Sequence, residues 1–108
     1  MTLRNKRLGI VVSTADNPQD WTAAFGLARA ACNADCEVSM FFMSDAVGEL
    51  PAWQVAIGQL EDDGCELIAC ASSAAAAGLG EPDVGMLLGS QDDHAAIVQR
   101  ADRVVAFT

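Results

Sequence analysis

The sequence has four cysteines, a residue type that can act as a nucleophile, bind a metal or form a disulfide, and we single out Cys70. It follows a short apolar run at 67–69 and precedes an alanine-rich stretch at 71–77, which predicts a strand end and a helix start. Unpaired backbone N–H groups at a helix start favour a thiolate, and the hydroxyls of Ser72 and Ser73 could act as further donors. The pattern therefore predicts a nucleophilic thiol, although most free cysteines are small buried hydrophobes.

The remaining cysteines are not expected to carry the chemistry. Cys65 precedes Cys70 along the same strand by about 16 Å, at roughly 3.3 Å per residue. A disulfide needs Cα atoms within about 7 Å, so Cys65 cannot pair with Cys70 and is interpreted as structural. Cys32 and Cys36 flank a turn at the opposite end of the expected sheet. A zinc site there would need two more ligands, and His94 is the only histidine, so we expect no metal site.

Two polar residues lie where they could assist Cys70. His94 falls in the first turns of the last expected helix and could donate a proton to a sulfur intermediate, although solvated helix histidines are commoner. Asp45 follows the second expected strand and could orient a group in the pocket, although a loop carboxylate that caps its own turn is commoner. With Ser72 and Ser73, these residues complete the candidate site around Cys70.

Two other functions of α/β proteins fit this sequence poorly. A nucleotide or flavin site needs a phosphate loop after the first strand, whereas the loop at 13–18 has no glycine and carries Asp16. A phospho-receiver domain needs an aspartate at the end of the third strand and a late lysine, but Cys70 occupies that position and Lys6 is the only lysine. We therefore expect no organic cofactor.

Apolar runs alternate with helical patterns along the chain. Short runs rich in β-branched residues predict strands at 8–12, 38–43, 65–69, 84–88 and 103–107. Helical spacing predicts helices at about 18–32, 51–61, 71–77 and 91–101, with loops at 45–50 and 79–83. The clearest helix starts are Asn17 before Pro18, and Ser90 with Asp93, which resembles a capping box.

This alternation predicts a single domain over residues 1–108, a three-layer α/β/α fold with a mainly parallel sheet of about five strands. The strands at 8–12 and 67–69 should lie in the interior of the sheet. Ligands bind such folds at the carboxyl ends of the strands, and Cys70 is expected at that edge.

Composition narrows the possible partners. Hydrophobic residues make up 52% of the 108, more than one small core hides, so we expect a homo-oligomer. A net charge of -9 disfavours nucleic acids and anionic membranes. No apolar run approaches the roughly 20 residues that span a bilayer. The run at 8–12 is too short for a signal peptide, so we expect a cytoplasmic protein whose cysteines are thiols.

Three stretches together resemble the DsrE/DsrF/TusD family of small sulfur-relay proteins. They are an aromatic strand and its loop at 41–47, a strand that ends in Cys70 before a small-residue helix at 64–74, and a closing strand at 101–107. The resemblance runs from Leu8 to Phe107 and implies a parallel α/β domain that forms oligomers, here a trimer or hexamer. In active members, the cysteine matching Cys70 accepts a persulfide sulfur and passes it on. Ala46 replaces the family's usual loop glycine, and the basic residues typical of the TusD branch are absent after 71–77, which argues against tRNA thiolation.

Two hypotheses follow from these observations. In the first, the chain is a sulfur carrier with sulfurtransferase-like activity, in which the Cys70 thiolate takes sulfane sulfur from a donor and yields it to an acceptor thiolate. Its partners would be sulfur donor and acceptor proteins or small thiols, with no metal or organic cofactor. In the second, the chain is a non-catalytic assembly or binding subunit whose Cys70 is buried and unreactive. Solvent access at the Cys70 sulfur distinguishes the two.

Overall fold

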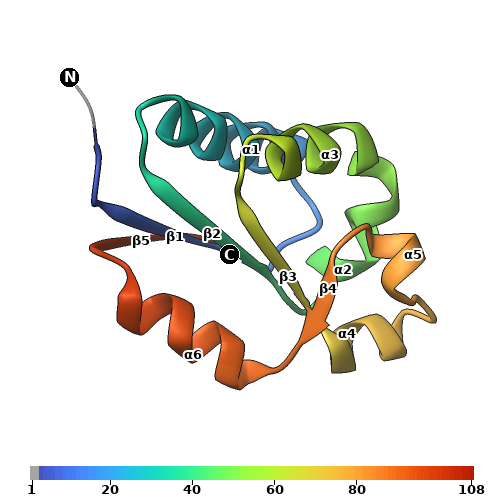
Figure 1. The fold of residues 1–108 in the computed structure, drawn as a ribbon. Coiled ribbons are helices and arrows are strands. Elements are labelled where there is room, and N and C mark those ends of the chain that lie inside the picture. Colours follow the sequence, from blue (N-terminus) through green and yellow to red (C-terminus); the bar gives the residue numbers. More distant parts are fainter. Residues whose placement is uncertain (1–2) are drawn as a thin grey trace.

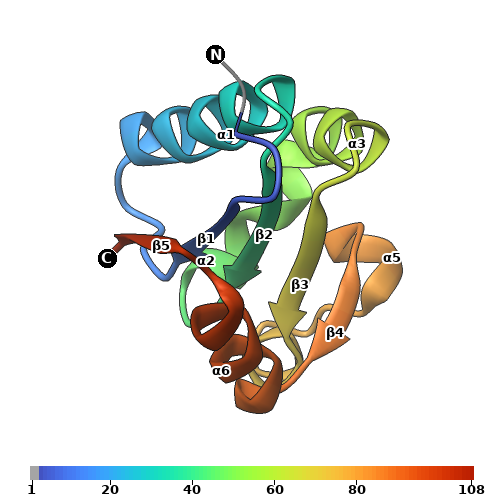
Figure 2. The same ribbon diagram turned by 60° about the vertical axis from the view of Figure 1, so that its left-hand side comes forward.

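The computed structural model describes residues 3–108 and contains one all-parallel sheet of five strands (Figure 1). The strands are β1 (Arg7–Val12), β2 (Glu37–Phe42), β3 (Glu66–Cys70), β4 (Leu87–Gly89) and β5 (Arg103–Phe107). The helices are α1 (Pro18–Asn33), α2 (Ala46–Glu49), α3 (Gln54–Asp62), α4 (Ala71–Ala76), α5 (Glu81–Val84) and α6 (Gln91–Arg100), with a 3₁₀ turn η1 (Leu50–Trp53). The strand order is β4-β3-β2-β1-β5, so β1 and β3 are interior strands as predicted (Figure 2).

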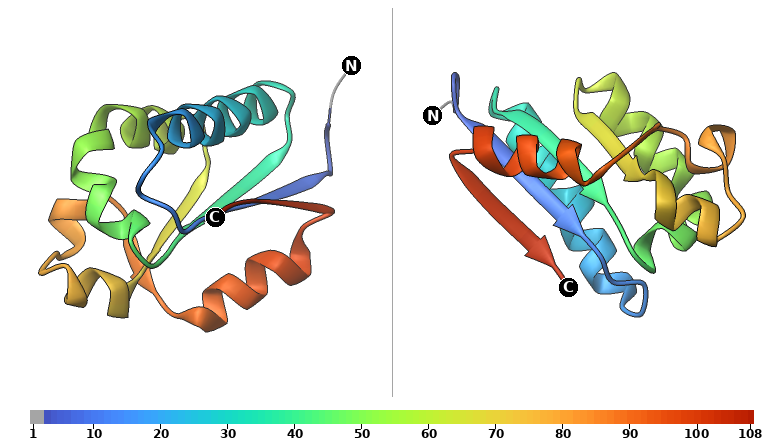
Figure 3. Two further views of the ribbon diagram at one scale, coloured as in Figure 1. Left: turned by 180° about the vertical axis from the view of Figure 1, so that it is seen from behind. Right: turned by 90° about the horizontal axis from the view of Figure 1, so that it is seen from below.

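Helices cover both faces of the sheet and make the three layers that the sequence predicts. The helices α1 and α3 lie side by side on one face, and α6 lies on the other (Figures 1 and 3). The short helices α2 and α4 lie near the carboxyl ends of β2 and β3 (Figure 1). Among residues 3–108, no helix combines the length and the apolar character needed to cross a bilayer.

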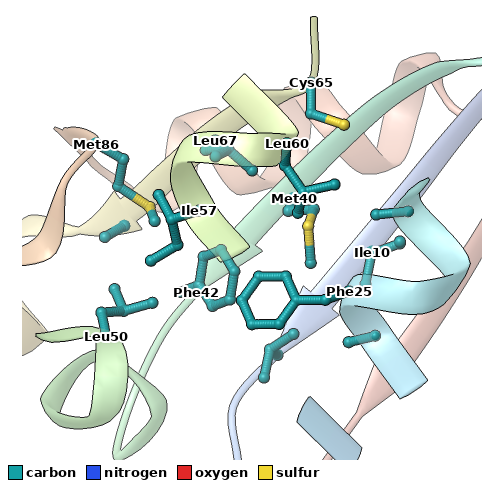
Figure 4. Close-up of a cluster of buried hydrophobic side chains, with 14 of the residues drawn as sticks. Ile10, Phe25, Met40, Phe42, Leu50, Ile57, Leu60, Cys65, Leu67 and Met86 are labelled. Carbon is teal, nitrogen blue, oxygen red and sulfur yellow. The ribbon is translucent and has the colours of Figure 1, made fainter. Parts of the chain in front are cut away.

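The main core fills the space between the sheet and the pair α1 and α3 (Figure 4). Phe42 of β2 packs against Phe25 of α1, with ring centroids 6.2 Å apart. Ile57 and Leu60 of α3 are buried beside them. Each such side chain contributes about 1.5–3 kcal/mol by leaving water. The predicted inward face of α1 is confirmed, since Trp21, Ala24, Phe25 and Ala28 are all buried, while Cys32 at its end is half-buried.

The predicted starts of α1 and α6 are both confirmed. The Asn17 side chain accepts a hydrogen bond from the Gln19 N–H at 2.9 Å. Ser90 Oγ accepts from the Asp92 N–H at 3.1 Å, and Asp93 Oδ2 accepts from the Ser90 N–H at 2.8 Å. These bonds satisfy N–H groups that the first helical turn leaves unpaired, which is why the capping residues fix the helix starts.

The loop predicted at 45–50 is wrong, because this stretch forms α2 and the start of η1, and α3 begins at Gln54 rather than Pro51. Ala46, Val47 and Leu50 are fully buried. Val47 and Leu50 follow Ala46 by one and four residues, which is the spacing of one helix face. The segment is too short for this spacing to be recognised in the sequence.

The loop predicted at 79–83 is also partly wrong, because it contains most of α5. The Asp83 carboxylate accepts the Gly80 N–H at 2.9 Å, and Pro82 is tolerated because it lies in the first helical turn. Gly85 ends the helix with a positive φ of 73°. As a result, Val84 belongs to α5, and the fourth strand begins at Leu87 rather than Val84.

Gly89 pairs with Cys70 across β4 and β3, and it has no room for a side chain. A Cβ atom there would lie 2.7 Å from Ile68 Cγ2 and closer still to the Asp93 carboxylate that caps α6. We expect Gly89→Ala to lower the free energy of unfolding by about 1–3 kcal/mol, since this overpacking displaces the capping group. Gly58→Ala in α3, where a Cβ meets no atom within 4 Å, is the control and should raise stability by about 0.5–1 kcal/mol. Urea denaturation measures both, and a Gly89→Ala variant as stable as the natural chain would contradict this account.

Candidate functional site

Cys70 is the last residue of β3 and directly precedes α4, as the sequence predicts. Its backbone is still extended (φ -65°, ψ 120°), and the chain becomes helical at Ala71. The alanines of α4 favour the helix, while the apolar residues before Cys70 are held in the sheet between β2 and β4. This junction places the thiol at the carboxyl edge of the sheet, beside the end of β2.

An apolar cluster covers the Cys70 side chain on the α6 face of the sheet. Phe41 of β2 and Ile97 of α6 are buried against it, and Met43 and Ile68 are packed at the margin. Cys70 is only 5% exposed as a result. The sulfur is therefore less accessible than direct attack on a large donor requires, and a donor must displace part of this cover.

Hydrogen bonds to the sulfur oppose the effect of this burial. Burial raises the pKa of Cys70, but the hydroxyls of Ser72 and Ser73, with smaller contributions from their backbone N–H groups, bring the pKa down to about 7 from an ordinary 9.0. Ser72 Oγ lies 3.2 Å from the Cys70 sulfur. Because α4 has only six residues, we attribute the lowered pKa to these local donors rather than to a helix dipole. The predicted support roles of Ser72 and Ser73 fit this geometry.

Ser44 is a residue of the site that the sequence does not reveal. Its N–H donates to Ser73 Oγ at 3.0 Å, which leaves the Ser73 hydroxyl hydrogen free to point at the sulfur. Ser44 holds a left-handed backbone with φ 56°, a conformation uncommon outside glycine, asparagine and aspartate. Such strain persists only where the surroundings enforce it, and no sequence signal marks this serine in advance.

Asp45 lies near the site but not on the sulfur. Its exposed side chain lines a hollow of about 360 Å³ together with Ser44, Gly48 and Ser73. It makes no capping hydrogen bond at the start of α2, so the expectation that it caps its own turn is wrong. Cys70 does not line this hollow, whereas Ser73, whose hydroxyl lowers the pKa of Cys70, does.

His94 approaches the site through Phe41. Its ring stacks on the Phe41 ring with centroids 5.0 Å apart, and Nδ1 lies 2.9 Å from Gln91 Oε1. Phe41 in turn packs in the same cluster as Cys70. Within residues 3–108 no hydrogen bond joins His94 to the sulfur, so proton donation would require the imidazole to move.

The larger hollows lie away from Cys70. One of about 570 Å³ lies beside the start of β1 and is lined by residues that include Lys6, Leu27 and Cys36. Another, of about 380 Å³, lies between the Arg7–Glu37 and Arg100–Glu66 ion pairs. In the described part of the chain, no three His, Cys, Asp or Glu side chains are grouped to hold a metal ion. The site is thus a covered thiol with hydroxyl donors, suited to exchange of sulfur rather than to binding a large ligand.

Met43 is the part of the cover that can be removed with least damage to the fold, because it is packed at the margin of the cluster and only half-buried. We expect Met43→Ala to raise the rate at which iodoacetamide alkylates Cys70, since the thiol becomes easier to reach. Val55→Ala, on the exposed face of α3, is the control and should leave that rate unchanged. Mass spectrometry of quenched time points gives the rate, and an unchanged rate in Met43→Ala would show that Met43 does not limit access.

Comparison with known proteins gives a family and a fold. A family model described as the DsrE/DsrF-like family matches residues 6–107. A solved structure of a conserved protein of unknown function from Bacteroides thetaiotaomicron superposes with a TM-score of 0.79 at 13% identity, and the match covers 95% of this chain and 96% of that one. At that identity the likeness supports the fold alone. No curated protein matches the chain significantly.

Proposed function

The chain belongs to the DsrE/DsrF-like family, which suggests a role of the sulfur-relay type, and on that premise we propose that it carries sulfane sulfur as a persulfide on Cys70. The observation that carries the proposal is the position of Cys70 at the end of β3 with Ser72 Oγ 3.2 Å from its sulfur, an arrangement that lowers the pKa of the thiol to about 7 in spite of burial. About half of such a thiol is thiolate at neutral pH, which is the nucleophilic form.

Loading is a thiol exchange in which the Cys70 thiolate attacks the outer sulfur of a donor persulfide. A new S–S bond forms at Cys70, the donor's own S–S bond breaks, and the donor leaves as a thiolate. In the second step, an acceptor thiolate attacks the outer sulfur on Cys70, and the Cys70 thiolate leaves. A thiol of low pKa leaves faster, so the hydroxyls of Ser72 and Ser73 favour both the first attack and the final release.

In this proposal the apolar cover makes delivery of the sulfur selective. A persulfide held beneath Phe41 and Ile97 is shielded from small oxidants and from unselective thiols. A partner able to move Met43 aside gains access, which makes delivery depend on docking. Ser73 stays in place through the Ser44 N–H during this exchange. His94 is a candidate for a proton donor to the leaving thiolate, through a rotation off Phe41.

We propose that the working form is a homo-oligomer, a trimer or hexamer by analogy with the family, located in the cytoplasm. Leu87 on the edge strand β4 is 66% exposed, and Val98 of α6 and Val104 of β5 are exposed too. Leu87 lies across from Ile68, two residues before Cys70, so association there would extend the cover of the thiol. We expect light scattering at micromolar concentration to give the mass of an oligomer, and a monomer would contradict the proposal.

The alternative function is that of a non-catalytic assembly subunit, and one observation favours it. Cys70 is 5% exposed, close to what an unreactive structural cysteine would have. The two functions differ in whether Cys70 exchanges sulfur, and a transfer assay separates them.

The test is transfer of sulfur from loaded protein to an acceptor. The protein is incubated with a persulfide donor and separated from it, then mixed with a small acceptor thiol, and sulfane sulfur on the acceptor is measured by cyanolysis. We expect transfer by the natural chain and by Cys36→Ser, and none by Cys70→Ser. No transfer by the natural chain would contradict the carrier role and favour the assembly subunit, and transfer by Cys70→Ser at the natural rate would contradict the assignment of the sulfur to Cys70.

A further inference from the structure

Cys32 and Cys65 form a second pair of sulfurs that the carrier role does not use. Cys32 lies in the last turn of α1, and Cys65 directly precedes β3, thirty-three residues later in the sequence. Their sulfur atoms lie 2.8 Å apart. The pair lies at the amino end of β3, whereas Cys70 is at its carboxyl end, and Figure 4 places Cys65 above Leu60 at the margin of the core.

The backbone holds both cysteines in this position. The Cys65 N–H donates to the Leu60 carbonyl at 3.0 Å, which fixes the turn from α3 into β3. The Cys32 carbonyl accepts the Asp35 N–H at 3.0 Å, in the turn from α1 into β2. The two sulfurs therefore meet because the backbone fixes the turns that carry them.

The two thiols differ in the way that an attacking and a resolving cysteine differ. Cys32 is half-buried and is the more exposed of the two residues. Cys65 is buried, and burial raises its pKa far above the ordinary range, with the hydrogen bond to Cys32 and the charge of Cys32 raising it further. Cys65 thus keeps its proton while Cys32 is a thiol, and a mixed disulfide at Cys32 removes both of the influences that Cys32 exerts on the pKa of Cys65.

We propose that Cys32 and Cys65 are a redox-active pair that low-molecular-weight disulfides of the glutathione type convert into an intramolecular disulfide. The Cys32 thiolate attacks one sulfur of the oxidised glutathione, forms a mixed disulfide and releases one glutathione thiolate, which takes up the proton of Cys65. The Cys65 sulfur then attacks the Cys32 sulfur and releases the second glutathione. The two cysteines lose two electrons and two protons, and one glutathione disulfide becomes two thiols.

The neighbouring cysteines are not expected to take part. The Cys36 thiol donates instead to the Lys6 carbonyl, with 3.3 Å between sulfur and oxygen. Cys70 is separated from Cys65 by the length of β3. The disulfide would join the end of α1 to the start of β3 and so restrict the unfolded chain between them. This reaction goes beyond the proposed carrier role, because sulfur loading on Cys70 involves neither Cys32 nor Cys65.

The test uses Cys70→Ser, so that failure of the carrier proposal cannot affect the result. The protein is incubated with excess glutathione disulfide, and its intact mass and peptide map are recorded. We expect loss of two hydrogens, a cross-linked peptide pair that contains Cys32 and Cys65, and a Tm higher by about 5–10 °C that dithiothreitol reverses. Cys36→Ser in the same background is the matched control and should behave identically.

A further variant tests the order of the two steps. In Cys65→Ser with Cys70→Ser, Cys32 has no resolving partner, and we expect a stable glutathione adduct on Cys32. The proposal is overturned if Cys32 and Cys65 stay thiols in excess glutathione disulfide, if a different pair of cysteines is joined, or if the adduct on Cys32 persists while Cys65 is present.

Discussion

Replacing Ser72 and Ser73 together by Ala is expected to shift the midpoint of the pH–rate profile for Cys70 alkylation upward from about 7, toward the ordinary 9.0 of a cysteine. The hydroxyls are the largest of the influences that lower the pKa of Cys70. Their loss leaves burial, which raises the pKa, and the backbone N–H groups of residues 72 and 73, which lower it less strongly. The pKa rises in the double variant because the hydroxyls donate hydrogen bonds to the thiolate and stabilise it relative to the thiol.

The effect on rate at pH 7 is smaller than the effect on thiolate content. A full return of the pKa to 9.0 would lower the thiolate fraction about 50-fold. The thiolate that remains would be more nucleophilic, by roughly 6- to 10-fold for a Brønsted coefficient of about 0.4–0.5. We therefore expect alkylation at pH 7 to slow by no more than about five- to eight-fold, and the rate well above pH 9 to increase.

The pH–rate profile is measured over pH 5–10 by quenching the alkylation at timed intervals and analysing the products by mass spectrometry. Ser39→Ala on β2 is the control, because this serine lies near the start of the strand, where it pairs with Glu66. The single variant Ser72→Ala should shift the midpoint in the same direction by less than the double variant. A midpoint that stays near 7 in the double variant would mean that another feature of the site lowers the pKa of Cys70.

The second large effect concerns which cysteine reacts first. We expect limiting iodoacetamide at pH 7 to label Cys70 before Cys36, Cys65 or Cys32. Cys36, Cys65 and Cys70 are all buried, between 5% and 9% exposed, so access to the reagent differs little among them. The pKa values differ in direction, because burial raises those of Cys36 and Cys65 above the ordinary value, whereas hydroxyl donors lower that of Cys70.

Thiolate content then sets the order. At pH 7, a thiol with a pKa of about 7 is half ionised, whereas one at or above 9 is ionised to about 1% or less. Peptide mapping after partial alkylation gives the relative rates, and labelling in urea is the control, since unfolding should make the four rates similar. Earlier labelling of Cys36 or Cys65 would mean that the sulfur of Cys70 is inactivated by its cover.

The position of Cys70 could be predicted from sequence because it depends on local signals. The apolar run before it and the alanines after it specify a strand and a helix whatever the rest of the chain does. The same holds for Asn17 and Ser90, whose side chains bond within their own helix starts. The interior positions of β1 and β3 were also predicted, since alternating strands and helices leave few ways to build a parallel sheet.

The surroundings of Cys70 could not be predicted, because they depend on contacts between distant segments. The cover comes from Phe41 and Ile97, which meet the sulfur only after α6 packs on the sheet. The Ser44 N–H donates to Ser73 from a left-handed backbone conformation, which a serine in the sequence does not predict. The contact of Cys32 with Cys65 joins two residues that the sequence assigned to separate structural roles.

The central claim is that Cys70 accepts sulfane sulfur, and the mass of the loaded protein tests it most directly. The protein is incubated with a limiting persulfide donor, alkylated to trap the product, and analysed intact and as peptides. The account predicts a gain of one sulfur atom that maps to Cys70, present in Cys36→Ser and absent in Cys70→Ser. A gain that maps to another cysteine, or a natural chain that gains no sulfur, would contradict it.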